Sequence, residues 1–296
     1  MNKEELYSAI REYVDNTLLG LDNLKTRIKK VSDDLFDLCY AWRRFYDNRN
    51  IEEAYAIAQC MMQMMVCKIN SLLELADGVN IIPDNKKFKI LDVQSVAAVV
   101  RSMYELEFIF HNIFITQNTK NERDIALYLW EIKGMNNRQT LKYVPEKYKQ
   151  QQNEEHKQIE EIKAKIKDVV LKLNMTSKVK NSIFRCMNKD SIKIEGCVFH
   201  KDDNGCIIEF KTINFSDPGF GVLVLDNPDI YKYMSFQTHP SYLGVLQFGQ
   251  MFDQEFDVTI LKLLFIIALQ VSAIMYKEFV KSVDGAKEVL ESLKNQ

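Results

Sequence analysis

The residues best suited to chemistry lie in two short segments that are far apart in the sequence. The first segment places Arg101 and Glu105 one helical turn apart. The second segment, residues 231–241, reads YKYMSFQTHPS and contains Ser235 and His239, one of only four histidines in the chain. An imidazole can act as a general acid or base, and a guanidinium can hold a negatively charged group. The candidate site residues are therefore Arg101, Glu105, Ser235 and His239.

A helix over about residues 92–117 is expected to carry the first segment, with Asp92 as its N-cap. This helix begins with the apolar run 96–100, which predicts a central place in the fold. Arg101 and Glu105 share one of its faces because they are four residues apart. A charged pair on a central helix must be satisfied by other polar groups.

The second segment offers such groups in Tyr231, Ser235 and His239. We expect the guanidinium of Arg101 or the carboxylate of Glu105 to lie within hydrogen-bonding reach of this segment. Two interpretations of the network are open. It is either a structural network that fixes the register of the helices, or a functional site built on the same residues.

Other kinds of chemistry have weaker support. Ser235 and His239 are four residues apart in one segment, and no GxSxG elbow precedes the serine, so a hydrolase of that type is not indicated. Cys197, His200 and Cys206 lack a fourth ligand and a CxxC pair, which zinc sites usually have. Phosphate-binding and dinucleotide-binding glycine motifs are also missing from the sequence. We expect no cofactor and no metal.

The whole chain predicts a mainly α fold, a multi-helix bundle with a small β-hairpin or irregular insertion near residues 190–225. Five prolines and ten glycines in 296 residues favour long helices over a loop-rich sandwich. Patterns of apolar and boundary residues predict helices over 4–46, 51–77, 92–117, 121–134 and 145–173. We expect helix in more than half of the residues, and strands only within about 190–225.

The insertion contains the step Asn204-Gly205 between β-branched and aromatic residues, which is a hairpin signal. Ile192 and Ile194 offer a third short strand. The segment 78–92 is expected to be a loop, because Pro83 and polar residues break the apolar pattern.

Residues 1–48 are expected to form an N-terminal long helix or helical hairpin, and residues 49–296 a helical bundle that contains the insertion. The apolar stripe of the first segment repeats in heptad-like steps. Packing against the chain's own helices is favoured over an intermolecular coiled coil. A homo-oligomer or a partner protein bound through the N-terminal helix stays open.

Net charge and apolar segments set the expected compartment. A net charge of −2 gives no global attraction to nucleic acid and leaves only a local patch for RNA. No apolar signal region follows Met1, and no CxxC pair occurs, so we expect a cytoplasmic protein. The segment Thr259–Tyr276 contains Lys262 and Gln270, which favours a buried core helix over a membrane span. We therefore expect no membrane partner.

The two segments also carry a family resemblance. The pattern R-S-hydrophobic-aromatic-E at residues 101–105, followed by Y-hydrophobic-S-x-x-x-H-P-S at the second segment, resembles a family of uncharacterised bacterial helical proteins. That family is thought to be related to the HEPN superfamily of helical RNases, toxins and abortive-infection proteins. The resemblance covers about residues 50–280. It implies a helical fold and a shared polar centre of Arg101, Glu105, Ser235 and His239.

One departure from the HEPN pattern matters for activity. The catalytic HEPN signature is an arginine followed after four to six residues by a histidine on the same helix, whereas His111 follows Arg101 by ten positions. Nuclease activity would therefore need Arg101 and His239 to meet from different helices. The histidine would then act as general acid or base and the arginine would stabilise the phosphate, without a metal ion.

Two hypotheses follow. The first is a HEPN-like effector that binds or cleaves RNA, in a setting such as phage defence. The alternative is a non-catalytic helical interaction or sensor protein in which the polar centre is structural. Solvent access to Arg101 and His239 distinguishes them.

Overall fold

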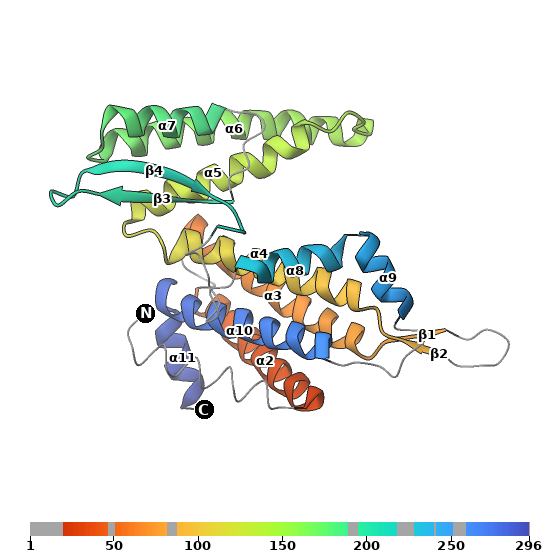
Figure 1. Cartoon of the computed structure of the whole chain (residues 1–296). Coiled ribbons are helices and arrows are strands. Elements are labelled where there is room, and N and C mark those ends of the chain that lie inside the picture. The colour runs from red at the N-terminus through yellow and green to blue at the C-terminus, as the bar shows by residue number, and fades with distance from the viewer. Residues whose placement is uncertain are drawn as a thin grey trace. The chain divides into compact units, whose positions relative to one another are not determined.

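The computed structural model describes residues 20–46, 51–81, 88–188, 195–217, 228–239, 241–250 and 259–295. Helices make up more than half of the chain, and the described strands form two antiparallel hairpins (Figure 1). The mainly α prediction is thus confirmed. The chain divides into two compact units, Met1–Phe110 with Ser216–Gln296, and His111–Phe215. The predicted division into residues 1–48 and 49–296 stays a prediction.

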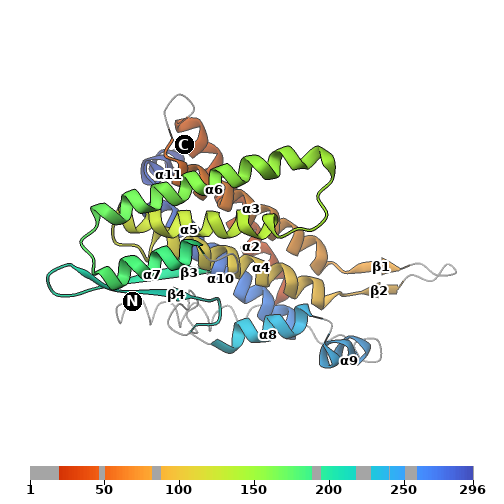
Figure 2. The same ribbon diagram turned by 90° about the horizontal axis from the view of Figure 1, so that it is seen from above.

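The first unit contains most of the helices. They are α2 (Leu21–Phe45), α3 (Glu53–Ala76), most of α4 (Val93–Phe114), α8 (Pro228–Thr238), α9 (Tyr242–Gln250), α10 (Thr259–Ser282) and α11 (Ala286–Lys294). Helix α2 packs against α3, α10 and α11. Strands β1 (Val79–Ile81) and β2 (Phe88–Ile90) pair antiparallel, and Figure 2 shows them extending beyond the ends of the helices.

The predicted apolar stripe of the N-terminal segment is confirmed for α2, and residues 4–19 lie outside the described residues. Five residues of the stripe are fully buried because three- and four-residue steps place them on one face, namely Leu24, Ile28, Leu35, Leu38 and Trp42. The other stripe residues of α2 are partly exposed or exposed. At its end, the indole of Trp42 donates a hydrogen bond of 2.8 Å to the carbonyl of Asp284. The same indole meets the ring of Phe279 edge-on, with 5.8 Å between centroids.

Helix α10 supplies the most apolar segment of this core. Its most apolar 18-residue window is 61% buried inside the protein, in agreement with the expected core helix, and Lys262 is half-buried in its first turn. By length and composition alone, α3 and α10 could each cross a membrane. The expected absence of a membrane partner stays a prediction.

The second unit contains three helices and the second hairpin within its described residues. They are α5 (Lys120–Gln139), α6 (Glu146–Lys172), α7 (Ser177–Asn188), β3 (Gly196–Lys201) and β4 (Ile207–Ile213). The hairpin predicted at Asn204-Gly205 is confirmed. Asp202 Oδ1 accepts hydrogen bonds from the backbone N–H groups of Asn204 and Cys206, and Gly205 takes a positive φ of 75°. The possible third strand at residues 192–194 lies outside the described residues.

Asn112, in the last turn of α4, holds the start of β3. Its side-chain amide donates to the carbonyl of Cys197 at 2.9 Å and accepts from the N–H of Cys197 at 3.0 Å. A Cβ at the neighbouring Gly196 would lie 2.6 Å from the Asn112 side chain. Glycine at this position therefore permits the close approach.

Three features of the fold differ from the sequence-based expectations. Helix α5 continues through Gly134 to Gln139, because one interior glycine costs only about 1 kcal/mol and a capping box of Thr119 and Glu122 anchors the helix start. Strands β1 and β2 lie in the segment expected to be a loop and outside 190–225; their β-branched and aromatic residues favour pairing. Helix α7 was not predicted at all.

Replacing Phe279 with alanine is expected to lower the free energy of unfolding by about 3 to 5 kcal/mol, because it leaves a cavity beside Trp42. The quantity to measure is the urea midpoint and slope for the full chain. Phe36→Ala is the matched control, since the Phe36 side chain on α2 is 56% exposed. Equal losses for the two variants would contradict the position of α10 in the core.

Candidate functional site

Helix α4 positions the first half of the site. The side chain of Asp92 accepts a hydrogen bond of 3.0 Å from the N–H of Ser95, which confirms the predicted N-cap. Two turns later, Arg101 Nε lies 2.8 Å from Glu105 Oε1, as expected for a pair four residues apart. The neighbouring Ser102 accepts a hydrogen bond of 2.6 Å from Lys68, which ties α4 to α3.

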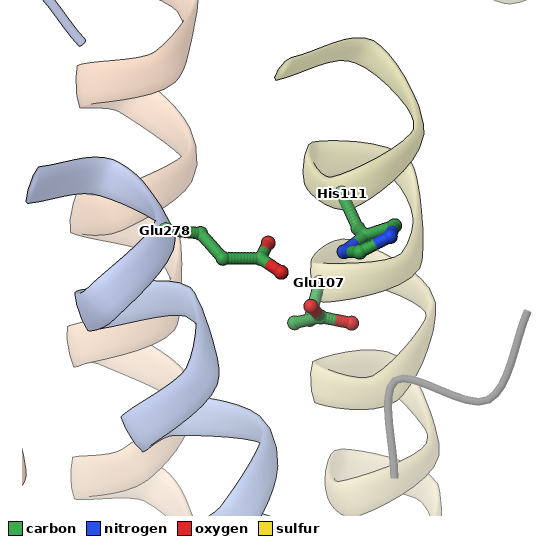
Figure 3. Close-up of side chains that lie close together, drawn as sticks. All are labelled: Glu107, His111 and Glu278. Carbon is green, nitrogen blue, oxygen red and sulfur yellow. The ribbon is translucent and has the colours of Figure 1, made fainter. Parts of the chain in front are cut away.

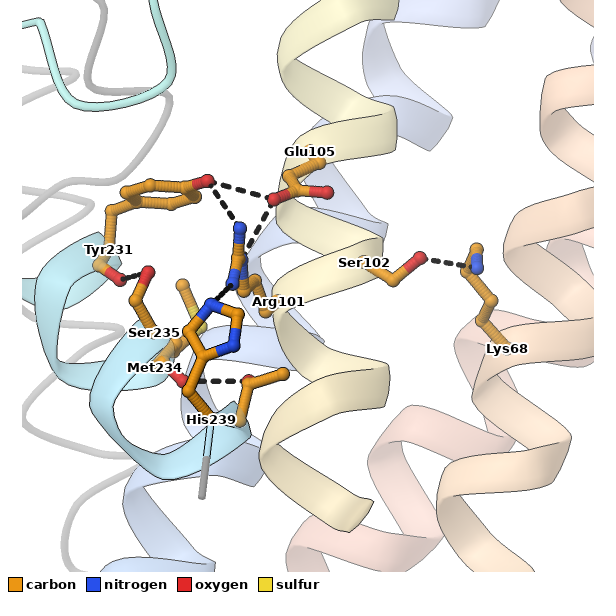
Figure 4. Close-up of polar contacts among 9 residues, drawn as sticks. Lys68, Arg101, Ser102, Glu105, Tyr231, Met234, Ser235 and His239 are labelled. Atoms are coloured by element: carbon orange, nitrogen blue, oxygen red, sulfur yellow. Dashed lines mark hydrogen bonds and ion pairs between the residues drawn. The ribbon is translucent and has the colours of Figure 1, made fainter. Parts of the chain in front are cut away.

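Helix α8 brings the second half of the site to Arg101, as Figure 4 shows. Arg101 Nη2 donates to the phenol oxygen of Tyr231 at 2.8 Å, and that phenol donates to Glu105 Oε1 at 2.9 Å. Arg101 Nη1 lies 3.3 Å from His239 Nε2. The predicted contact between the two segments is confirmed. We name this group the Arg101 centre; it consists of Arg101, Glu105, Tyr231 and His239.

Tyr231 contacts Arg101 through its ring as well as its hydroxyl. The guanidinium carbon of Arg101 lies 5.0 Å from the centroid of the Tyr231 ring, within the range of a cation–π interaction. On its other side the ring packs against Tyr104, with 5.8 Å between centroids. The orientation of the guanidinium is therefore set by a ring, a phenol and a carboxylate.

The Arg101 centre is open to solvent on one side. The side chains of Arg101 and Glu105 are 21% and 27% exposed, and His239 is exposed. A molecule from solution can reach the imidazole and the edge of the guanidinium. The centre is therefore not sealed in the core.

Burial and pairing keep the charge states of Tyr231 and Arg101 fixed near neutral pH. Burial raises the pKa of Tyr231 to about 12, and the hydrogen bond and charge of Glu105 add to the rise, whereas Arg101 opposes it. Burial acts to lower the pKa of Arg101, but the charges of Glu105 and Tyr231 outweigh it and raise that pKa overall. The phenol is thus neutral and the guanidinium cationic at physiological pH.

Ser235 is not joined to the centre by its side chain. Its hydroxyl donates to the carbonyl of Tyr231, one turn back in α8, at 2.9 Å. This local bond satisfies the hydroxyl within its own helix, as is common for serine in helices. Tyr231, by contrast, is missing from the four candidate site residues although it bonds to Arg101 and Glu105. Its spacing of eight residues from His239 is the signal that places both on one face of α8.

The arrangement can bind an anion and exchange a proton. Arginine carries five N–H donors, three of which serve the contacts above, so the guanidinium has N–H groups left for a phosphate. Since arginine has no acceptor, His239 accepts from it through Nε2, and a neutral ring then carries its proton on Nδ1. Acid–base chemistry next to a phosphate is therefore within the capacity of the centre.

Two groups of side chains contain residue types that can bind a metal ion. Cys197, His200 and Cys206 form no ligand group among the described residues, and burial raises the pKa of Cys197 and so disfavours its thiolate. The group of ligand-type side chains found in the described part of the chain is Glu107, His111 and Glu278. The sequence analysis assigned neither Glu107 nor His111 to a site.

Comparison of the chain with family models, with curated proteins and with solved structures gives no match. The geometry of the described residues therefore carries the argument on function.

Tyr231→Phe is expected to lower the free energy of unfolding by about 1 kcal/mol near pH 8, because the half-buried guanidinium and carboxylate lose their shared hydroxyl. The folded-state pKa of Tyr231 is raised to about 12 from its ordinary value of 10. Its contribution to stability is therefore present below pH 10 and is lost as the pH rises towards 12. Urea unfolding of both proteins across this range should show the difference between them shrinking.

Tyr242→Phe serves as the control for this substitution, since the Tyr242 side chain on α9 is 80% exposed. Its stability should match that of the unaltered protein at each pH. A difference between Tyr231→Phe and the unaltered protein that stays constant up to pH 12 would contradict the bonded role of the phenol.

Proposed function

We propose that the chain is a HEPN-like helical effector that binds RNA at the Arg101 centre and cleaves it. The supporting observation is the exposed imidazole of His239, 3.3 Å from a guanidinium that Glu105 and Tyr231 hold in place. Phage defence is the setting that the family resemblance suggests. The proposal needs no metal ion at this centre.

The chemistry would follow the usual path of metal-independent RNA cleavage. Nε2 of His239 leaves its contact with Arg101 and takes the proton of a 2′-hydroxyl, whose oxygen attacks the adjacent phosphorus. Arg101 stabilises the added negative charge on the pentavalent phosphate. The bond from phosphorus to the 5′-oxygen breaks, that oxygen takes a proton from solvent, and the products carry a 2′,3′-cyclic phosphate and a 5′-hydroxyl.

A non-catalytic interaction or sensor protein is the alternative, and one observation favours it. Three nitrogens of Arg101 already have protein partners, and the contacts with Tyr231 and His239 join α4 to α8 and the residue after it. In that case the network fixes the position of α8, and His239 is a structural residue. The two candidates differ in what loss of the imidazole changes.

His239→Ala is expected to lower the rate of RNA cleavage by about 100-fold or more, the range for loss of a general acid or base, and to shift the melting temperature little. The substrate is a labelled single-stranded RNA without added metal, and a 2′-O-methyl copy should resist cleavage because it lacks the attacking hydroxyl. His156→Ala is the matched control, an exposed histidine on α6. If the unaltered protein neither binds nor cleaves RNA, while His239→Ala lowers the melting temperature, the structural alternative holds.

A further inference from the structure

Glu107 on α4 is a charged residue in the described core, and burial of its charge costs free energy. Its side chain is 0% exposed, and the neighbouring carboxyl group of Glu278 can satisfy its buried oxygens only by sharing a proton. A buried carboxylate is strongly unfavourable unless it is neutralised. Glu107 lies two positions after Glu105, about 200° around the helix, so it points away from the Arg101 centre.

Two further ligand-type side chains surround this carboxylate, as Figure 3 shows. They are His111, one turn further along the same helix, and Glu278 on α10. The ligand atoms of the three side chains all lie within 4.8 Å of one another. We name these three residues the Glu107 cluster. The spacing of Glu107 and His111 is set by the continuous helix α4.

The packing beside the cluster holds α4 and α10 together at this level. The ring of Phe110 stacks on the ring of Phe279, with 6.5 Å between centroids and 30° between planes. Each phenylalanine is the sequence neighbour of a cluster residue. This ring contact therefore helps to hold α4 and α10 together beside the cluster.

Two carboxyl groups this close together are stabilised by a proton or a cation between them. Burial, the negative charge of Glu278 and a hydrogen bond with Glu278 raise the pKa of Glu107 well above its ordinary value. A single proton neutralises one carboxylate and leaves the other. A divalent cation neutralises both and also supplies partners for the buried oxygens of Glu107.

We propose that Glu107, His111 and Glu278 bind a divalent transition-metal ion that joins α4 to α10. Two carboxylates and one imidazole suit Zn²⁺, Mn²⁺ or Fe²⁺, whereas Mg²⁺ prefers oxygen ligands and retains several waters. Two ligand atoms that each lie about 2.1 Å from an ion are at most about 4 Å apart. The ligand atoms of the cluster lie within 4.8 Å of one another, so small side-chain rotations are enough to bring them around an ion. This role is separate from the proposed RNA cleavage, which uses a different face of α4.

The test measures metal binding and stability on the full chain. The protein is stripped with a chelator, dialysed and titrated with Zn²⁺, Mn²⁺ or Mg²⁺ alone, and bound metal is counted by mass spectrometry alongside thermal unfolding. We expect one Zn²⁺ or Mn²⁺ per chain and a rise in the melting temperature, with no such effect of Mg²⁺.

Glu107→Gln and His111→Ala are the two decisive variants. Loss of a residue that only supports a metal ligand lowers metal affinity by about 10- to 100-fold. Because these two residues would be ligands themselves, each substitution should lower the affinity for Zn²⁺ or Mn²⁺ by more than that. His156→Ala should bind as the unaltered protein does, which excludes a surface histidine as the ligand. Glu107→Gln keeps the shape of the side chain, and circular dichroism of the metal-free proteins checks that both variants fold.

Two outcomes would overturn the proposal. One is an unaltered protein that binds no transition metal, with Glu107→Gln becoming the more stable protein as the pH rises from acidic to neutral; that result assigns the cluster to a pair of carboxyl groups sharing a proton. The other is Mn²⁺ binding that survives both substitutions, which places the ion elsewhere.

Discussion

The cost of removing charged groups from water is the constraint on which the arrangement around α4 depends. This helix lies in the core and yet carries Arg101, Glu105 and Glu107 within two turns. Arg101 and Glu105 neutralise each other and remain partly exposed, so their burial costs little. Glu107 is fully buried beside a second carboxyl group, so its charge must be neutralised by something the protein takes from solution, a proton or a cation.

The same constraint explains how α8 is attached. Its mean hydropathy is near zero, and Ile230 and Met234 are its buried large apolar residues in the part that the structure describes. Such a helix gains limited free energy from apolar burial. The phenol of Tyr231 and the imidazole of His239 add bonds to a charged partner on α4, and such bonds are stronger than those between neutral groups.

The sequence allowed prediction wherever a local pattern determines the outcome. Periodic apolar residues located α2, α3, α4 and α6, and the cost of an isolated charge predicted that Arg101 would meet the segment of His239. Prediction failed where tertiary packing competes with local preference, as at Gly134, which α5 passes through, and at β1 and β2. It also failed for Ser235, because a hydroxyl in a helix can bond to its own backbone. Glu278 gave no signal, since nothing in the pattern of α10 shows which of its residues will face α4.

The two polar groups on α4 differ in net charge, and this difference determines what each can bind. In the Arg101 centre one positive and one negative side chain cancel, and the exposed edge of the guanidinium faces solvent beside an imidazole that can accept or give a proton. Such a site is suited to a phosphate, because the guanidinium has N–H groups that can donate to the negatively charged phosphate oxygens. The Glu107 cluster has two acidic groups and one imidazole, of which Glu107 is buried and the other two are partly exposed, so a cation is favoured over an anion. Helix α4 thus carries two polar groups on different faces, one with a partly exposed guanidinium and one with a buried carboxyl group.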